Sequence, residues 1–337
     1  MIEIEQIQQC YLFIFYDFPL YYNIFMLGES IKVRAPATVA NVSCGFDCLG
    51  YAISDPADIV TISKKIDPDI EISISGMKAD TIPTITEKNT AGKALLSLLE
   101  GLNIKQGFKV HIEKGIHPGS GLGSSAASAV AAVFGANKLL DSPLQLEDLL
   151  IHCMNGEIVS SGYSHADNVA PALLGGFILV RSYDPLDVLK LPIPENLLSI
   201  NVLPDYIVNT MEARAILPKE ITLTSAIKQC GNLSGFIAGL YEKDFTLMSR
   251  SMVDFFAEPF RSSLIPGYNA VRKSAMASGA LGCGISGSGP SVFALSDSLN
   301  KANIIGEAMV SSFKEAGLES KLYISPVNTL PPKILDS

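Results

Sequence analysis

Histidine and cysteine are scarce in this sequence, and their scarcity limits the metal chemistry that the chain can support. Only four histidines and six cysteines occur in 337 residues. Cysteines this sparse do not form the framework of a disulfide-stapled secreted domain, so we expect reduced thiols and a cytoplasmic location. Cys44 and Cys48 have no second pair nearby, which argues against a zinc site. The other cysteines are Cys10, Cys153, Cys230 and Cys283.

Positive charge and long apolar runs are also lacking. The 25 lysines and arginines are outnumbered by 34 acidic residues, and the sequence pI is about 5.0, which argues against a nucleic-acid partner. Residues 11–27 are aromatic and aliphatic, but Asp17 and Pro19 interrupt them. This run is shorter than the roughly 20 apolar residues that cross a bilayer, so we expect no membrane partner. We interpret residues 1–30 as an N-terminal extension, either a packed arm or an upstream-extended gene start.

The remaining composition, 48% hydrophobic and 18% charged, is that of a globular protein. Strands are predicted at residues 31–35, 57–63, 69–74 and 108–114, with Pro36 ending the first. A helix is predicted after Asn89-Thr90, with Asn89 or Thr90 as its cap, and another at residues 144–155. A shift in composition at residues 182–196 marks the boundary between two domains. In the second half we predict, in order, strand 198–203, helices 221–240 and 244–253, a helix after Pro266, strand 282–295, helix 299–316 and strand 319–325. This order predicts an α+β sandwich with a mainly antiparallel sheet.

A glycine-rich loop leads into an alanine-rich helix at residues 119–140, GSGLGSSAASAVAAVFGANKLL. Ser124 or Ser125 is predicted to cap this helix. The glycines permit positive φ and a close approach of the backbone to a ligand, so the loop can form a nest of N–H donors for a phosphate. No lysine follows the last glycine, so this is not the Walker pattern, and a phosphate here needs a metal or residues from elsewhere. The alternative is a tight turn before a buried helix.

Polar residues stand out in two further segments. Asn41 and Asp47 lie in the loop that follows the first strand, where they either stabilise turns or contact a ligand. Glu157 lies among small and apolar residues, as a helix-surface charge or an oxygen ligand for Mg²⁺. Residues 160–168 are densely polar and run directly into an apolar segment, which indicates a site containing His165, Asp167 and Asn168. The alternative is a solvated turn.

Two arginines and a second glycine-serine turn occur in the second half. Arg214 and Arg261 each present a planar fork that can bind a carboxylate or phosphate, although a lone arginine more often forms a surface ion pair. Residues 284–291 form a glycine-serine turn between strand-like segments, which could close over the same ligand as the first loop.

Three segments together, PATVANVSCGFDCLGYA, GSGLGSSAASA and GISGSGPSVFAL, resemble the signature motifs of the GHMP kinase superfamily. The segments HADNVAPALLGGF, NTMEARAILP and EPFRSSLIPGY resemble its homoserine kinase branch, over residues 31–327 in all. The resemblance implies an N-terminal ATP-binding domain like ribosomal protein S5 domain 2 at residues 31–190. It also implies a C-terminal ferredoxin-like α/β sandwich at residues 191–337, and a homodimer. Two departures are His117 in place of a common proline, and Ser43-Cys44 in place of glycine-proline.

The resemblance also implies roles for individual residues. Ser125 and Glu157 would bind Mg²⁺, and Asn168 would lie near the transferred phosphoryl group. The residues implied around the amino acid are Asn41, Asp47, His165, Arg214 and Arg261. The residues implied around ATP are Asn89, Pro118, Gly119, Ser120, Gly121, Leu122, Gly123, Ser124, Ser125, Ala126 and Ala127.

The implied reaction is ATP-dependent phosphorylation of the side-chain hydroxyl of L-homoserine, in threonine biosynthesis. On this hypothesis Arg214 and Arg261 bind the substrate carboxylate and Asp47 binds its ammonium group. Asn168 and His165 orient the hydroxyl, and Asp167 is the one candidate proton acceptor. The alternatives are another GHMP kinase, such as one acting on mevalonate, or a non-catalytic nucleotide-binding regulator of the same fold.

Overall fold

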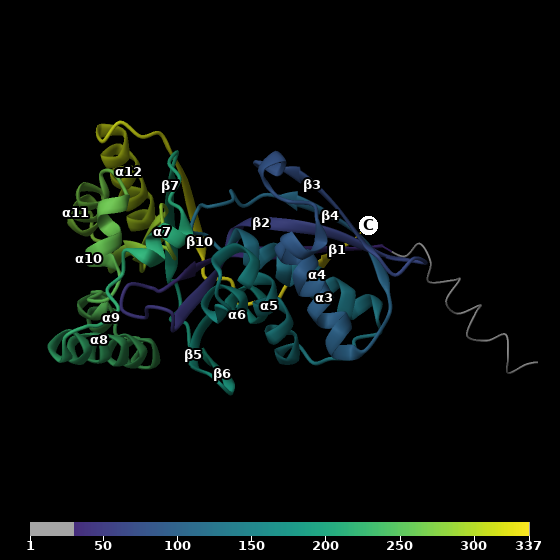
Figure 1. The fold of residues 1–337 in the computed structure, drawn as a ribbon. Coiled ribbons are helices and arrows are strands. Elements are labelled where there is room, and N and C mark those ends of the chain that lie inside the picture. Colours follow the sequence, from purple (N-terminus) through teal and green to yellow (C-terminus); the bar gives the residue numbers. More distant parts are fainter. Residues whose placement is uncertain (1–29, 337) are drawn as a thin grey trace, which may run out of the picture.

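The computed structural model describes residues 30–336 and shows two β-sheets, each packed against helices (Figure 1). The predicted N-terminal extension therefore lies outside the described residues, apart from Ser30. No helix within residues 30–336 is long and apolar enough to cross a membrane. The mixed architecture confirms the predicted α+β class.

The first sheet has the strand order β11-β1-β2-β4-β3, and β5 joins it by pairing with β2 and β6. Helix α4 packs on β1 and β2, and α3 and α5 pack against α4. Almost every residue of α4 is buried, as expected of a helix that is apolar on all sides. The strands are β1 (Ser30–Ala40), β2 (Leu49–Lys65), β3 (Ile70–Gly76), β4 (Gly107–Lys114), β5 (Phe177–Tyr183), β6 (Leu186–Leu191) and β11 (Lys333–Leu335). The helices are α3 (Thr90–Leu102), α4 (Ser124–Leu139), α5 (Leu150–Ser161) and α6 (Ala166–Leu174).

The second sheet is antiparallel, with the order β10-β7-β9-β8. Helices α11 and α12 pack together against it and enclose a second core cluster. Its strands are β7 (Leu198–Pro204), β8 (Gly282–Ile285), β9 (Val292–Ser296) and β10 (Ser320–Pro326). The helices of this half are α7 (Thr210–Ala215), α8 (Leu223–Glu242), α9 (Phe245–Ser251), α10 (Glu258–Arg261), α11 (Tyr268–Ala277) and α12 (Leu299–Glu315).

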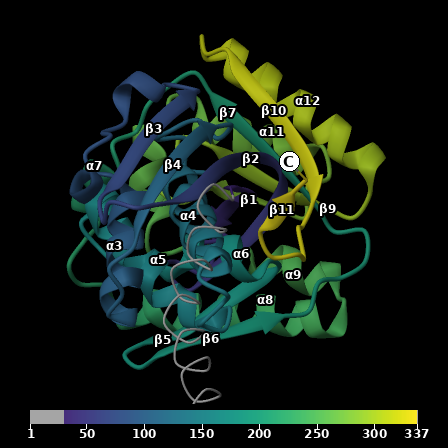
Figure 2. The ribbon, with the colours of Figure 1, turned by 90° about the vertical axis from the view of Figure 1, so that its right-hand side faces the viewer.

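An aromatic contact joins the two halves. Tyr51 of β2 packs against Phe177 of β5, with ring centroids 4.6 Å apart, and against Phe293 of β9, at 6.2 Å. Its hydroxyl shares a 2.8 Å hydrogen bond with Ser199 of β7. The chain also returns at its end, because β11 pairs with β1 (Figure 2). The two sheets are therefore held in a fixed relation, and a pocket can be built between them.

Three sequence predictions of elements need correction, and some elements were not predicted. Pro36 does not end the first strand: β1 continues to Ala40 through a register shift between Pro36 and Ala37, which accommodates the missing N–H. The predicted strand 282–295 is two strands, β8 and β9, around the glycine-serine turn. The predicted helix 144–155 begins only at Leu150 and continues to Ser161. Helix α7 was not predicted.

Gly50 allows α6 to pack closely on β2, and this contact yields a prediction about stability. A Cβ atom at Gly50 would lie 1.8 Å from the backbone oxygen of Asp167. We expect Gly50→Ala to lower the free energy of unfolding by about 1–3 kcal/mol, because the α6 backbone must shift. Urea unfolding measures the change.

A matched control is Gly231→Ala in α8, where no atom lies within 4 Å of the added Cβ. This variant should be unchanged or more stable by up to about 1 kcal/mol, since alanine favours a helix. A Gly50→Ala protein as stable as wild type contradicts the proposed packing of α6.

Candidate active site

A pocket of about 440 Å³ lies where the two halves meet, and most predicted site residues line it. This volume is in the range of small-molecule sites. The predicted residues that line it are Asn41, Asp47, Asn89, Pro118, Gly119, Ser120, Gly121, Gly123, Ser124, Ser125, Glu157, His165, Asp167, Asn168, Arg214 and Arg261. Leu122, Ala126 and Ala127 do not line it, because their side chains are buried in the first core cluster. Those three can offer a ligand only their backbone.

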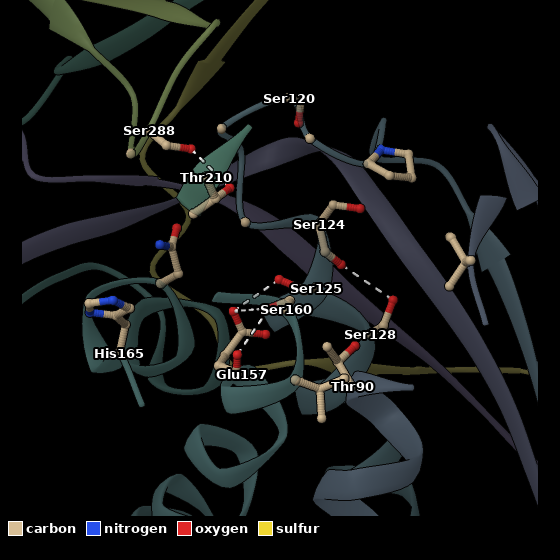
Figure 3. Close-up of a pocket in the computed structure, with 18 of the residues that line it drawn as sticks. Thr90, Ser120, Ser124, Ser125, Ser128, Glu157, Ser160, His165, Thr210 and Ser288 are labelled. Atoms are coloured by element: carbon tan, nitrogen blue, oxygen red, sulfur yellow. Dashed lines mark hydrogen bonds between the residues drawn. The ribbon is translucent and has the colours of Figure 1, made fainter. Parts of the chain in front are cut away.

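The N-terminus of α4 faces this pocket without a side-chain cap (Figure 3). The prediction that Ser124 or Ser125 caps the helix is wrong. The N-cap is Gly123, with φ of 67°. The Ser124 hydroxyl instead donates to the Ile116 carbonyl at 3.0 Å, and the Ser125 hydroxyl donates to Glu157 Oε2 at 2.9 Å. The first-turn N–H groups of α4 thus remain available to an anion.

Glycine is required at two positions in the loop before α4. A Cβ at Gly121 would lie 2.5 Å from the Ser286 carbonyl oxygen, and one at Gly123 would lie 2.0 Å from Thr38 Oγ1. The Ser286 hydroxyl donates to the Gly121 carbonyl at 2.7 Å. The two glycine-serine turns predicted to share a ligand are therefore in contact, one from each half of the molecule.

A buried ion pair contacts the start of α4, directly after the glycine-rich loop. Lys114, at the end of β4, pairs with Asp58 of β2 and donates to the Ser124 carbonyl and to Ser128 Oγ, both at 2.8 Å. Asp58 also accepts from the backbone N–H of Ile116 at 3.0 Å. Burial lowers the pKa of Lys114, and the charge of Asp58 opposes that shift. Because Lys114 lines the pocket, it supplies positive charge near a loop that has no Walker lysine.

Asn89 lines the pocket, but most of its hydrogen-bonding capacity is used within the protein. Its Oδ1 caps α3 by accepting from the N–H groups of Ala91 and Gly92, at 3.0 and 3.2 Å, which confirms the predicted helix cap. Its Nδ2 donates to the Pro83 carbonyl at 2.7 Å. One amide hydrogen therefore remains for a nucleotide.

Glu157 and Ser125 present oxygen atoms beside the N-terminus of α4 (Figure 3). Burial raises the pKa of Glu157 to about 7, and the Ser125 hydrogen bond and the charge of Lys114 oppose that shift. No group of three or more His, Cys, Asp or Glu residues suited to a metal occurs within residues 30–336. This donor set fits Mg²⁺, which commonly takes one or two protein oxygens and completes its shell with water and phosphate oxygens.

The loop of residues 41–48 carries Asp47 in a constrained backbone. Asn41, Val42, Ser43 and Asp47 all have positive φ, between 45° and 70°, which is unusual for a β-branched residue such as Val42. Asn41 contributes most of the constraint. Its Oδ1 accepts from the Asp47 N–H at 3.0 Å, and its Nδ2 donates to the Gly287 carbonyl at 2.8 Å. Asn41 thus serves the loop as well as lining the pocket.

Asp47 and Arg214 form an ion pair with Nη1 and Oδ2 2.6 Å apart. His165 Nδ1 lies 4.0 Å from the other Asp47 oxygen. Arg261 is 5% exposed, and its guanidinium donates to the carbonyls of Ala213 and Gly287, both at 2.9 Å. Asp47 was predicted to bind a substrate ammonium, and in this structure it already has a cationic partner.

Helix α6 brings the predicted catalytic residues to the same pocket. Asn168 Oδ1 accepts from Thr38 Oγ1 at 2.7 Å. Asp167 is 3% exposed, and its Oδ1 has no hydrogen-bond partner among the described residues. Burial, followed by the negative charge of Asp47, raises the pKa of Asp167 to about 7. Burial lowers the pKa of His165; the charge of Asp47 opposes that shift, and the charges of Arg214 and Arg261 add to it.

Sequence reasoning missed several pocket residues, including Lys114, Ser128, Thr210 and Ser288. For Lys114 a signal was present. Residues 108, 110, 112 and 114 form the buried phase of β4, and a lysine in that phase needs a buried partner. Thr210 and Ser288, whose hydroxyls lie 3.3 Å apart, come from α7 and the second turn and carried no such signal.

The Asp58–Lys114 pair predicts a strong coupling. We expect Asp58→Asn to cost about 3–5 kcal/mol of folding free energy, because it leaves the Lys114 charge buried without an anion. The double variant Asp58→Asn/Lys114→Met removes that charge and should recover a large part of the loss. Urea unfolding of wild type, Asp58→Asn, Lys114→Met and the double variant measures the coupling between the two residues.

The matched control is Asp69→Asn, which breaks the exposed Lys65–Asp69 pair and should leave stability close to that of wild type. If the losses of unfolding free energy in Asp58→Asn and Lys114→Met simply add up in the double variant, the buried pair is contradicted.

The raised pKa of Asp167 predicts a pH-dependent stability. The folded protein holds this proton to about pH 7, whereas an unfolded aspartate has a pKa near 3.8. Ionisation of Asp167 therefore weakens the folded state as pH rises through this window. Relative to wild type, Asp167→Asn should gain about 2–3 kcal/mol between pH 5 and pH 8. Urea unfolding without nucleotide measures this difference, and a difference independent of pH contradicts a buried protonated Asp167.

Comparisons with known proteins agree with this geometry. The model of the GHMP kinases N terminal domain matches residues 89–176, and that of the GHMP kinases C terminal domain matches residues 236–315. Homoserine kinase of Chlorobaculum tepidum is 44% identical over 321 residues, covering 92% of this chain and 99% of the relative. Homoserine kinase of Chloroherpeton thalassium is 45% identical over 312 residues, covering 89% and 98%.

Solved structures give the same answer. The crystal structure of homoserine kinase from Cytophaga hutchinsonii is 50% identical, with a TM-score of 0.89, and covers 92% of this chain and 98% of that one. Mevalonate kinase of L. major is 16% identical, with a TM-score of 0.66 over 88% of this chain and 96% of its own, and shares the fold alone. The chain belongs to the homoserine kinase family of the GHMP kinases.

Proposed function

We propose that this protein transfers the γ-phosphoryl group of ATP to the side-chain hydroxyl of L-homoserine and forms O-phospho-L-homoserine, a step of threonine biosynthesis. One observation carries the proposal. A single pocket, where the two halves of the molecule meet, is lined by the uncapped N-terminus of α4, by the guanidinium groups of Arg214 and Arg261 and by the carboxylate of Asp47. The first feature suits a polyphosphate, and the second suits an amino acid. Family membership supports the same reaction.

At the nucleotide end, residues 119–127 and the N-terminus of α4 bind the phosphates. Lys114 adds positive charge beneath the loop. Ser125 and Glu157 hold Mg²⁺, which neutralises phosphate charge when bound. Glu157, whose pKa burial raises to about 7, would be held in its ionised form by a bound Mg²⁺.

At the amino-acid end, Arg214 and Arg261 bind the substrate carboxylate. Asp47 holds the ammonium group and shares its charge with Arg214, to which it is already paired. Asn41 keeps Asp47 in place through the Asp47 N–H. Each charge-assisted hydrogen bond contributes about 1.5–3 kcal/mol, so a compound that lacks either group is rejected by the polar groups it leaves unpaired.

Between these ends, α6 positions the reacting hydroxyl. Asn168, held by Thr38, and His165 orient the hydroxyl toward the γ-phosphorus. The new bond forms between the substrate oxygen and phosphorus as the bond to the β-phosphate oxygen breaks. The hydroxyl proton passes to Oδ1 of the ionised form of Asp167, a form that is populated near neutrality because the pKa is about 7. This oxygen has no hydrogen-bond partner among the described residues.

A mevalonate-type activity is less well supported, because mevalonate has no ammonium group for Asp47. A non-catalytic regulator would not need the intact set of Ser125, Glu157 and Asn168. Three further expectations remain proposals: a homodimer, a cytoplasmic location, and domains at residues 31–190 and 191–337. The domain division is supported by the change of sheet between β6, which ends at Leu191, and β7, which begins at Leu198.

A coupled ADP-release assay tests the proposed reaction. We expect turnover with ATP, Mg²⁺ and L-homoserine, and at least a tenfold lower kcat/KM with mevalonate. Arg214→Ala should lower kcat/KM for L-homoserine by about 10- to 100-fold, since one or two charge-assisted bonds are lost.

Arg181→Ala is the matched control, because Arg181 pairs with Asp187 on the surface and does not line the pocket. It should retain wild-type kinetics. Preference for mevalonate, or equal losses in the two arginine variants, would overturn the assignment.

A further inference from the structure

One aromatic ring contacts both arginines of the proposed carboxylate site. The guanidinium carbon Cζ of Arg214 and that of Arg261 each lie 5.2 Å from the ring centroid of Phe46. Arg214 also lies 5.5 Å from the ring of Tyr163. Both arginines line the pocket, whereas Phe46 does not. Phe46 therefore contacts both cations without being part of the pocket lining.

The two guanidinium groups are not equally neutralised. Arg214 has an ion pair with Asp47. Arg261 is buried, and within residues 30–336 it has no carboxylate at ion-pair distance; its partners are backbone carbonyls and the Phe46 ring. Two like charges near one ring repel each other, and the negative face of an aromatic ring offsets part of that repulsion. The pair then retains positive charge for an anion from solution.

The backbone around Phe46 is fixed by contacts from both halves of the molecule. The Asn41 N–H donates to the Leu49 carbonyl at 2.8 Å, and the Gly45 N–H donates to the Asn41 carbonyl at 2.8 Å. Gln229 Nε2 of α8 donates to the Cys44 carbonyl, also at 2.8 Å. A strained loop persists when its surroundings determine it in this way. The ring is thus a rigid support for both arginines.

We propose that Phe46 is a positioning residue that joins Arg214 and Arg261 into one carboxylate-reading unit and thereby determines specificity for an α-amino acid. The inference rests on the proposed function of this pocket. It goes beyond it in assigning the discrimination to an aromatic ring outside the pocket wall. A purely structural Phe46 would instead pack the loop and affect every substrate alike.

The test compares three amino alcohols or hydroxy acids as substrates. L-homoserine has both charged groups, 3-aminopropan-1-ol lacks the carboxylate, and 4-hydroxybutanoate lacks the ammonium. For Phe46→Leu we expect kcat/KM for L-homoserine and for 4-hydroxybutanoate to fall about tenfold, as two cation–π contacts are lost. The value for 3-aminopropan-1-ol and the KM for ATP should stay within about twofold of wild type.

Two variants keep the test independent of folding. Phe46→Tyr retains an aromatic face and should keep wild-type discrimination within about threefold. Phe255→Leu removes a similar contact, with Lys228 at 5.3 Å from its ring, and neither residue lines the pocket, so its kinetics should not change.

The outcomes separate the two proposals. If wild type does not phosphorylate L-homoserine, the proposed function fails before the Phe46 variants are compared. If wild type is active and Phe46→Leu lowers kcat/KM equally for all three compounds, or for none, the inference about Phe46 is wrong.

Discussion

The buried pair of Asp58 and Lys114 is the interaction on which the site depends most. It joins β2 to β4 and, through the Ser124 carbonyl and Ser128, both strands to the first turn of α4. A buried ion pair is costly unless further hydrogen bonds satisfy it, and here each partner has several. The pair fixes the direction in which α4 points its free N–H groups. It also brings a lysine to the glycine-rich loop from the preceding strand β4 rather than from the position after the last glycine.

Local charge explains how an acidic protein can bind an anionic nucleotide. The chain has a net charge of −9, yet Lys114, Arg214 and Arg261 line one pocket. Burial raises the pKa values of Glu157 and Asp167 to about 7. Near neutrality each of the two carboxyl groups therefore carries only part of a negative charge. On the proposed mechanism, Mg²⁺ bound at Glu157 would favour its ionised form, and only the ionised form of Asp167 would accept the hydroxyl proton.

The sequence supported much of the fold and the membership of the site, for reasons that are local. The glycines before an alanine-rich run predicted a loop and a helix, Asn89 predicted a helix cap, and the alternation of residues 108–114 predicted a strand. Each of these signals lies within a short stretch of the chain. The cap proposed for Ser124 or Ser125 was wrong because both hydroxyls donate hydrogen bonds to residues outside α4, Ser124 to the Ile116 carbonyl and Ser125 to Glu157. Long-range contacts of this kind leave little signal in one sequence, and the contacts of Phe46 with two arginines about 170 and 215 residues away left none.

The central proposal for this molecule is that one cleft holds nucleotide and amino acid end to end. A crystal structure with L-homoserine, Mg²⁺ and a non-hydrolysable ATP analogue measures this directly. We predict phosphates along residues 119–127, the homoserine carboxylate against Arg214 and Arg261, and a hydroxyl within about 3–3.5 Å of the γ-phosphorus. An amino acid bound outside this pocket, or with its carboxylate directed away from both arginines, would contradict it.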